Sequence, residues 1–199
     1  MTTPTAAPTV TRLHLGCGRS PLPGWVNVDA VAGPGVDLVH DLDRCADRPL
    51  PYPSDSVDEF LASHLLEHLH HPLPFMQELH RVARPGAAAT FHVPYGSSDD
   101  AFEDPTHVRQ YFVNSWIYFG QPAYWRADYG YRGDWRTECI ELTVARDRYD
   151  GAAPAAILDD VLRSRNVVLE MRARLVAVKP VRAPRQDLQE QRELRFVLV

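Results

Sequence analysis

The chain has 199 residues, of which 45% are hydrophobic and 24% are charged, and its formal net charge is −5. This length allows one domain with a sizeable core, and a mildly acidic chain gives no electrostatic reason to expect a nucleic acid as partner. No apolar run approaches the ~20 residues that cross a bilayer, so we expect no membrane partner.

The cysteines and the N-terminus indicate the compartment. Cys17, Cys45 and Cys139 are odd in number, widely spaced and without a Cys-x-x-Cys pair, which favours a reducing environment over a disulfide framework. The first residues carry no positive charge followed by an apolar core, so they do not form a secretory signal. We therefore expect a cytoplasmic protein with a disordered lead-in over 1–10 and a single domain over 11–199.

Short apolar runs separated by turns predict a sheet in the first half of the chain. The link between the first two strands contains Pro21 and Pro23 and is too short for a crossover helix. We expect an abbreviated first crossover. The predicted strands lie at 13–15, 25–29, 35–41, 57–62 and 87–93.

Helical periodicity appears after the fourth predicted strand. Residues 63–69 are expected to begin a helix. A stronger helix is predicted over 72–84, with apolar residues at three-residue steps and a stop at Pro85-Gly86. A second amphipathic helix is expected over 152–165, and strands over 167–178 and 194–199. Strands alternating with helices indicate an α/β fold with a mostly parallel seven-stranded sheet and an antiparallel closing strand.

A ligand site is predicted at the carboxyl ends of the first three strands. Gly16-Cys17-Gly18 follows the first strand as a bend without side chains at its two glycines. Asp29 and Asp41 follow the next two strands. Ligands of open parallel sheets bind at this edge, where a carboxylate can accept both hydroxyls of a ribose. The residues favour a nucleoside site, with turn capping by the two aspartates as the alternative.

The order of these motifs resembles class I S-adenosylmethionine-dependent methyltransferases. The resemblance spans about residues 11–95. Within this family, the chain is similar to a compact subgroup that lacks the first crossover helix. The resemblance implies a Rossmann-like fold and S-adenosylmethionine as cofactor. Its motifs are Leu-His-Leu-Gly-Cys-Gly, Gly-Trp-Val-Asn-Val-Asp, Val-Asp-Leu-Val-His-Asp-Leu, Leu-Pro-Tyr-Pro, Ser-Val-Asp-Glu-Phe-Leu-Ala-Ser-His-Leu-Leu-Glu-His-Leu and Arg-Pro-Gly.

The resemblance also implies roles for single residues. The backbone of Gly16, Cys17 and Gly18 is expected to line the methionine portion of the cofactor. Asp29 is expected to hold the ribose hydroxyls.

The remaining cofactor contacts are expected from the next two strand ends. Asp41 would accept from the adenine amino group, and Leu42 would donate from its backbone and pack on the ring. Ser63 and His64 would face the amino-acid part or the sulfonium.

The acceptor side is expected from the segment 95–135, which holds twelve of the nineteen aromatic residues. Within an insertion over about 96–150, these residues are predicted to form a lid over a small-molecule acceptor, with a satellite core as the alternative. The expected acceptor-binding residues are Tyr95, Arg109, Tyr111 and Trp116.

His107 is the candidate general base because its unperturbed pKa lies near neutrality, and Asp104 is expected to orient it. The alternative is a turn followed by a capped helix with His107 in its first turn. The sequence leaves open whether nitrogen, oxygen or carbon is methylated, and the oligomeric state.

Three other functions are alternatives to methyl transfer. A nicotinamide dehydrogenase needs a third glycine where this chain has Pro21. A zinc hydrolase is suggested by His64-x-x-Glu67-His68, with Glu138 or Glu141 as a third ligand. That run also belongs to the methyltransferase motif, so no metal is expected. A non-catalytic nucleoside-binding protein stays open.

Overall fold

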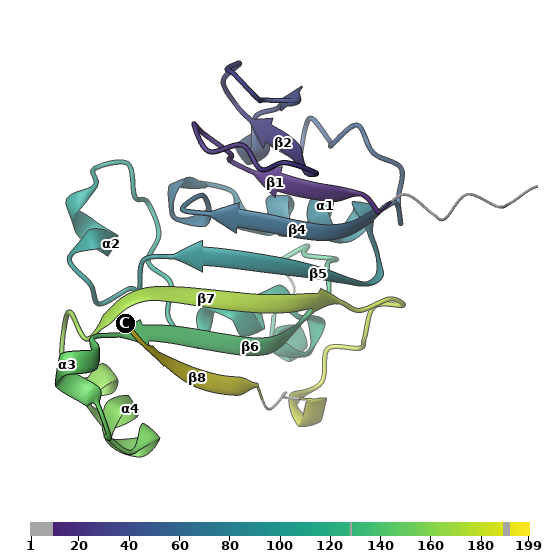
Figure 1. The fold of residues 1–199 in the computed structure, drawn as a ribbon. Coiled ribbons are helices and arrows are strands. Elements are labelled where there is room, and N and C mark those ends of the chain that lie inside the picture. The colour runs from purple at the N-terminus through teal and green to yellow at the C-terminus, as the bar shows by residue number, and fades with distance from the viewer. Residues whose placement is uncertain (1–9, 128, 189–191) are drawn as a thin grey trace, which may run out of the picture.

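The structure is a computed structural model that describes residues 10–127, 129–188 and 192–199. Residues 1–9 of the expected lead-in lie outside the described residues. The described residues form one eight-stranded sheet in the order β3-β2-β1-β4-β5-β7-β6-β8 (Figure 1). The strands are β1 Arg12–Leu15, β2 Val26–Asp29, β3 Leu38–Val39, β4 Val57–Ser63, β5 Ala83–Val93, β6 Trp135–Val144, β7 Val168–Ala177 and β8 Glu193–Leu198.

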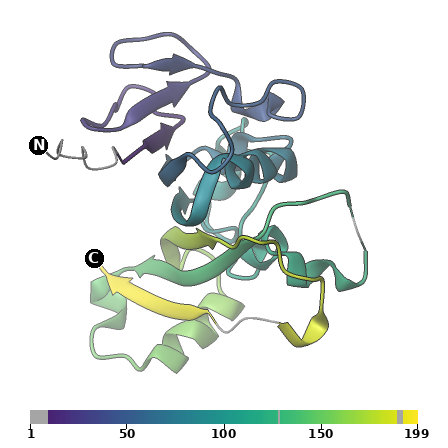
Figure 2. The same cartoon turned by 90° about the vertical axis from the view of Figure 1, so that its right-hand side faces the viewer.

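The first five strands are parallel, and β7 runs antiparallel between β5 and β6. This confirms the mostly parallel α/β sheet with an antiparallel part. The edge strands are β3 and β8, so the first three strands and the last strand lie at opposite ends of the sheet, as Figure 2 shows in purple and yellow. Strand order reverses at β1, which has β2 on one side and β4 on the other. A topological switch point of this kind places ligands at the carboxyl ends of the strands.

Helix α1 (Pro72–Val82) covers one face of the sheet and lies behind it in Figure 1. A proline in its first turn replaces an amide that would have no helical partner. Phe75, Met76 and Leu79 are fully buried, because the three- and four-residue spacing turns them toward the strands. The predicted helix over 72–84 is thus confirmed, two residues shorter at its end.

The other helical elements are shorter. Helix α4 (Pro154–Arg163) buries Ile157 and Val161. The remaining elements are α2 Asp100–Glu103 and α3 Arg146–Tyr149, and the 3-10 helices η1 Leu42–Arg44, η2 Leu66–His68, η3 Ser115–Phe119, η4 Gln121–Trp125 and η5 Gln186–Leu188. Within the described ranges, no helix is both long and apolar enough to cross a membrane.

Charged side chains pair between β6 and β7. Arg172 of β7 donates to Glu141 of β6 at 2.9 Å, and Arg174 donates to Glu138 at 3.2 Å. A face without a packed layer is expected to be polar in this way. The turns over 16–25 supply no crossover helix, as predicted.

Three elements differ from the prediction. Only η2 forms where a helix was expected over 63–69. Strand β3 keeps two residues of the expected 35–41. Strand β6 lies inside the expected lid segment and separates β7 from β8, so the sheet has eight strands and not the predicted seven. A register shift between Thr137 and Cys139 interrupts the alternation of β6, so its sequence lacks a clean period of two.

Candidate functional site at the carboxyl ends of the strands

The bend after β1 depends on its two glycines. Gly16 and Gly18 have φ angles of +65° and +53°, which residues other than glycine rarely adopt. A Cβ at Gly16 would lie 3.0 Å from Cδ1 of Leu65, whereas a Cβ at Gly18 would meet nothing within 4 Å. The absence of a side chain at Gly16 lets Leu65, the residue before η2, pack against the bend. Gly18 faces open space.

Asp29 closes this bend from the tip of β2. Its Oδ2 accepts from the backbone N–H of Gly18 at 2.8 Å, and its Oδ1 accepts from that of Val31 at 2.9 Å. The turn-capping alternative is therefore present in the structure. It does not exclude a ligand, because each carboxylate oxygen can accept a second hydrogen bond.

Asp41, which lies two residues after the end of β3, also caps a turn with its carboxylate. It is the N-cap of η1 and accepts from the N–H of Asp43 at 3.1 Å. Leu42 is 4% exposed and packs in the core. The backbone of His40 donates to the carbonyl of Asp29 at 2.8 Å, so the ends of β2 and β3 are fixed to each other.

Ser63 ends β4, and His64 follows it with a φ of +50°. The His64 ring is half exposed between two carboxylates, with Nδ1 3.2 Å from Glu67 Oε1 and Nε2 3.2 Å from Glu170 Oε1. Glu67 and then Glu170 raise the pKa of His64 above its ordinary value, against the opposing effect of burial. His92 of β5 contacts the other oxygen of Glu170 at 3.1 Å.

This network was missed at the sequence level. Glu170 lies 106 residues from His64, and only the antiparallel pairing of β7 with β5 brings them together. The alternation of β7 marks Glu170 as outward-facing but does not indicate which strand adjoins it.

The segment 106–111 is docked onto η2. The backbone N–H groups of Val108 and Arg109 both donate to the carbonyl of Glu67, at 2.8 and 3.2 Å. The guanidinium of Arg109 donates to the carbonyls of Leu69 and His70 at 3.2 and 2.7 Å. Two nitrogens of the Arg109 guanidinium are thus engaged by backbone carbonyl groups.

His107 is buried by this docking, with 8% of its side chain exposed. Its ring centroid lies 4.8 Å from that of His68, and its Nε2 lies 3.9 Å from Asp104 Oδ2. Asp104 itself accepts from the backbone and hydroxyl of Thr106, at 2.7 and 2.6 Å. No helix follows this turn in the described residues over 104–114, so the capped-helix alternative does not form.

Three of the predicted acceptor-binding residues lie in the core. Trp116 is fully buried and stacks between Phe91 and Tyr111, with ring centroids 5.6 and 5.5 Å away. Burial raises the pKa of Tyr111, whose hydroxyl donates to the carbonyl of Leu66 at 3.3 Å. Tyr95 is 4% exposed. These three side chains are therefore part of the buried core and not of an exposed acceptor site.

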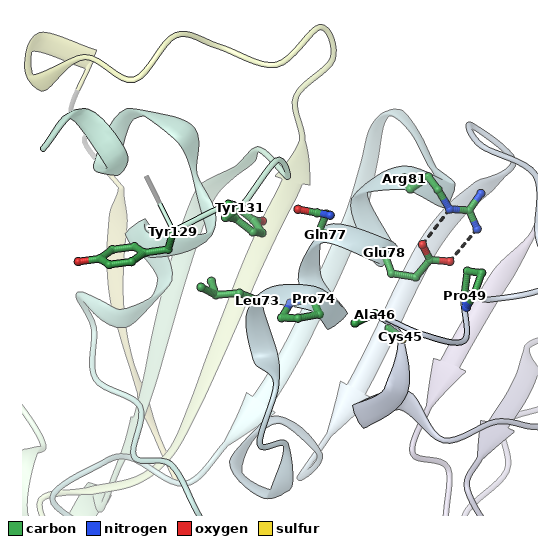
Figure 3. A pocket seen from close by; sticks show the side chains of 11 residues that line it. Cys45, Ala46, Pro49, Leu73, Pro74, Gln77, Glu78, Arg81, Tyr129 and Tyr131 are labelled. Atoms are coloured by element: carbon green, nitrogen blue, oxygen red, sulfur yellow. Dashed lines mark hydrogen bonds and ion pairs between the residues drawn. The ribbon is translucent and has the colours of Figure 1, made fainter. Parts of the chain in front are cut away.

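A separate pocket of 580 Å³ lies beside α1 (Figure 3). Its charged pair, Glu78 and Arg81, is joined at 2.6 Å, and Glu78 also accepts from the backbone of Leu50 at 2.7 Å. Tyr129 and Tyr131 line the opposite side. None of the predicted site residues lines this pocket.

These features define an α/β protein with a ligand edge at its switch point, and part of the chain matches a known domain. Residues 13–91 match a family model described as a methyltransferase domain. This match supports a SAM-dependent methyltransferase, with S-adenosylmethionine as the expected cofactor.

Solved structures share this fold at low identity. A SAM-dependent methyltransferase from Archaeoglobus fulgidus is 14% identical, with a TM-score of 0.57 over 85% of this chain and 87% of that one. One from Methanosarcina mazei is 11% identical, with a TM-score of 0.53 over 86% and 94%. A chain from the Haloferax volcanii complex between the Trm112 activator and a putative methyltransferase is 15% identical, with a TM-score of 0.50 over 85% and 83%. No curated protein matches the sequence.

Proposed function

We propose that this chain methylates a small-molecule acceptor at the carboxyl ends of β1, β2 and β4. The observation that carries the proposal is the Asp29 carboxylate, held against the bend at Gly18 by a 2.8 Å hydrogen bond. When bound, S-adenosylmethionine supplies an electrophilic methyl group, and the residues of this edge bind and orient it.

The edge fits that cofactor in two respects. A Cβ at Gly18 would enter open space, so the backbone of Gly16, Cys17 and Gly18 leaves room for the methionine part. Asp29 keeps acceptor capacity for two ribose hydroxyls. Asp41 and Leu42 would then hold the adenine.

Ser63 and His64 are proposed to face the amino-acid part of the cofactor. The His64 ring is half exposed, and its two nitrogens lie 3.2 Å from Glu67 and from Glu170. A backbone φ of +50° at this histidine is a strained conformation of the kind found at functional sites.

The acceptor is proposed to bind beneath the segment that follows β5. Figure 1 shows α2 of this segment beyond the carboxyl ends of β4 and β5. Phe102 and Phe112 are 59% and 43% exposed there, while Tyr95, Tyr111 and Trp116 form the packed layer below. This arrangement suits a planar or apolar acceptor, which a closing segment would shield from water.

A small molecule is favoured over a nucleic acid because the chain is net negative. A reducing, cytoplasmic setting is proposed because Cys17, Cys45 and Cys139 are free and buried. His107 and Asp104 remain the candidates for handling a proton of the acceptor. The Arg109 guanidinium is engaged by backbone carbonyls, which favours a supporting role.

Calorimetric titration with S-adenosylhomocysteine tests the proposal. Asp29→Asn is expected to weaken binding about tenfold to a hundredfold, because a charged hydrogen bond contributes roughly 1.5–3 kcal/mol. Asp159→Asn is the matched control, since Asp159 is an exposed residue of α4 that pairs with Arg163. Unchanged affinity in Asp29→Asn, or no binding by the wild type, would overturn the proposed site.

A further inference from the structure

Glu67 is a buried carboxylate whose one ion-pair neighbour given by the described residues is the half-exposed ring of His64. Its side chain is 1% exposed, and neither oxygen has a hydrogen-bond partner. His64 lies close enough to one oxygen for an ion pair but is not oriented for a hydrogen bond. Burying an ionised group is costly unless a cation or several donors approach it. Oε2 of Glu67 has no hydrogen-bond partner, and a further cation beside it would lower the cost of burying this carboxylate.

Two histidines face the same point. Glu67, His68 and His107 each offer a ligand atom, and the three atoms lie within 4.8 Å of one another. Nδ1 of His107 is also buried without a hydrogen-bond partner. Three adjacent groups with unused lone pairs are expected to bind a common cation.

The fold fixes this cluster from two distant segments. η2 supplies Glu67 and His68, and the docked segment supplies His107. The two hydrogen bonds from the Val108 and Arg109 backbone to the carbonyl of Glu67 hold the segments together.

The residues around the cluster resemble the outer layer of a metal centre. Nδ1 of His68 lies 3.0 Å from Oγ1 of Thr106, and that hydroxyl donates to Oδ1 of Asp104 at 2.6 Å. Oδ2 of Asp104 lies 3.9 Å from Nε2 of His107. Metal-binding imidazoles commonly form a hydrogen bond through their second nitrogen, and the contact of His68 with Thr106 is of this kind.

We propose that Glu67, His68 and His107 form a binding site for a divalent first-row transition-metal ion. Two imidazoles and one carboxylate suit zinc, iron or nickel better than magnesium or calcium, which prefer oxygen ligands. Three protein ligands leave further coordination positions open.

This site differs from the zinc pattern considered in the sequence. Glu67 and His68 are shared with that pattern, but His107 replaces His64 as a ligand. The expected third ligands, Glu138 and Glu141, lie on β6 and pair with arginines. The metal proposal does not depend on cofactor binding, but a metal-bound His107 would not also be the proton acceptor considered above.

The test uses full-length protein stripped with a chelator and titrated calorimetrically with Zn²⁺. One equivalent is expected to bind. His107→Gln and Glu67→Gln are each expected to weaken binding at least tenfold. In cobalt-loaded protein, absorption bands typical of nitrogen and oxygen ligation are expected in the wild type and not in these variants.

The matched control is the double variant His70→Gln/His71→Gln. It removes an exposed histidine pair beside Asp43, which is the neighbouring place for adventitious zinc, and it is expected to keep wild-type affinity. Circular dichroism reports whether each variant folds. If His107→Gln does not fold, His68→Gln carries the test. The proposal is overturned if the wild type shows no saturable zinc binding, or if only the control loses it.

Discussion

The backbone N–H of Gly18 donates to Oδ2 of Asp29 at 2.8 Å, so the bend after β1 is fixed to the tip of β2. This contact joins a position without a side chain to a carboxylate that retains lone pairs. In the proposed cofactor site, the bend at Gly18 leaves space for the ligand and the Asp29 carboxylate offers it a charged hydrogen-bond acceptor.

We expect Gly16→Ala and Gly18→Ala to have different consequences. Both positions have positive φ, so each alanine costs about 1–2 kcal/mol in folding free energy. Gly16→Ala is expected to be the more destabilising, because its Cβ would lie 3.0 Å from Leu65. Gly18→Ala is expected to weaken S-adenosylhomocysteine binding, because its Cβ would enter the space left for the ligand. Urea unfolding and calorimetry measure the two effects.

Gly151→Ala is the matched control for this comparison. Gly151 has a φ of +74° and open space around its Cβ position, far along the chain from the bend. It is expected to lose similar stability to Gly18→Ala and to bind the ligand normally. Equal ligand affinity in Gly18→Ala and Gly151→Ala would remove the bend from the site.

The stability of the fold is expected to fall in mild acid through His80. Its Nε2 lies 3.0 Å from the carbonyl of Val178, and burial lowers the pKa of this histidine from 6.5. The folded state therefore binds a proton less readily than the unfolded state. Stability is fully present above about pH 6.5 and is lost as the pH falls from there through the folded-state pKa.

The measurement is the urea unfolding free energy of the wild type and of His80→Gln between pH 8 and pH 5. The wild type is expected to show the steeper loss of stability. Parallel pH profiles for the two proteins would contradict the assignment.

Arg109 is expected to hold the docked segment rather than a substrate carboxylate. Arg109→Lys loses the fork geometry that reaches the carbonyls of Leu69 and His70. We expect a loss of about 1 kcal/mol in stability and faster hydrogen exchange over residues 104–111. Arg136→Lys, at an exposed pair with Glu138, is the control. Unchanged exchange in Arg109→Lys would show that the backbone contacts hold the segment alone.

The sequence was most informative where local pattern and local structure coincide. The bend at Gly16–Gly18, the two aspartates at strand ends and helix α1 were all predicted, because each depends on residues within one or two turns of the chain. The family motifs lie in the same region. β6 was missed because a register shift breaks its alternation, and the helix expected over 63–69 shortened to η2, which is held by contacts from the distant docked segment.

The sequence by itself determined the α/β class, the missing first crossover helix and the residues at the carboxyl ends of the first three strands. Only the tertiary structure brought Glu170 to His64 and His107 to Glu67 and His68. The physical reason is that both contacts join segments remote in sequence, through strand pairing and backbone hydrogen bonds that have no signature in the side-chain pattern.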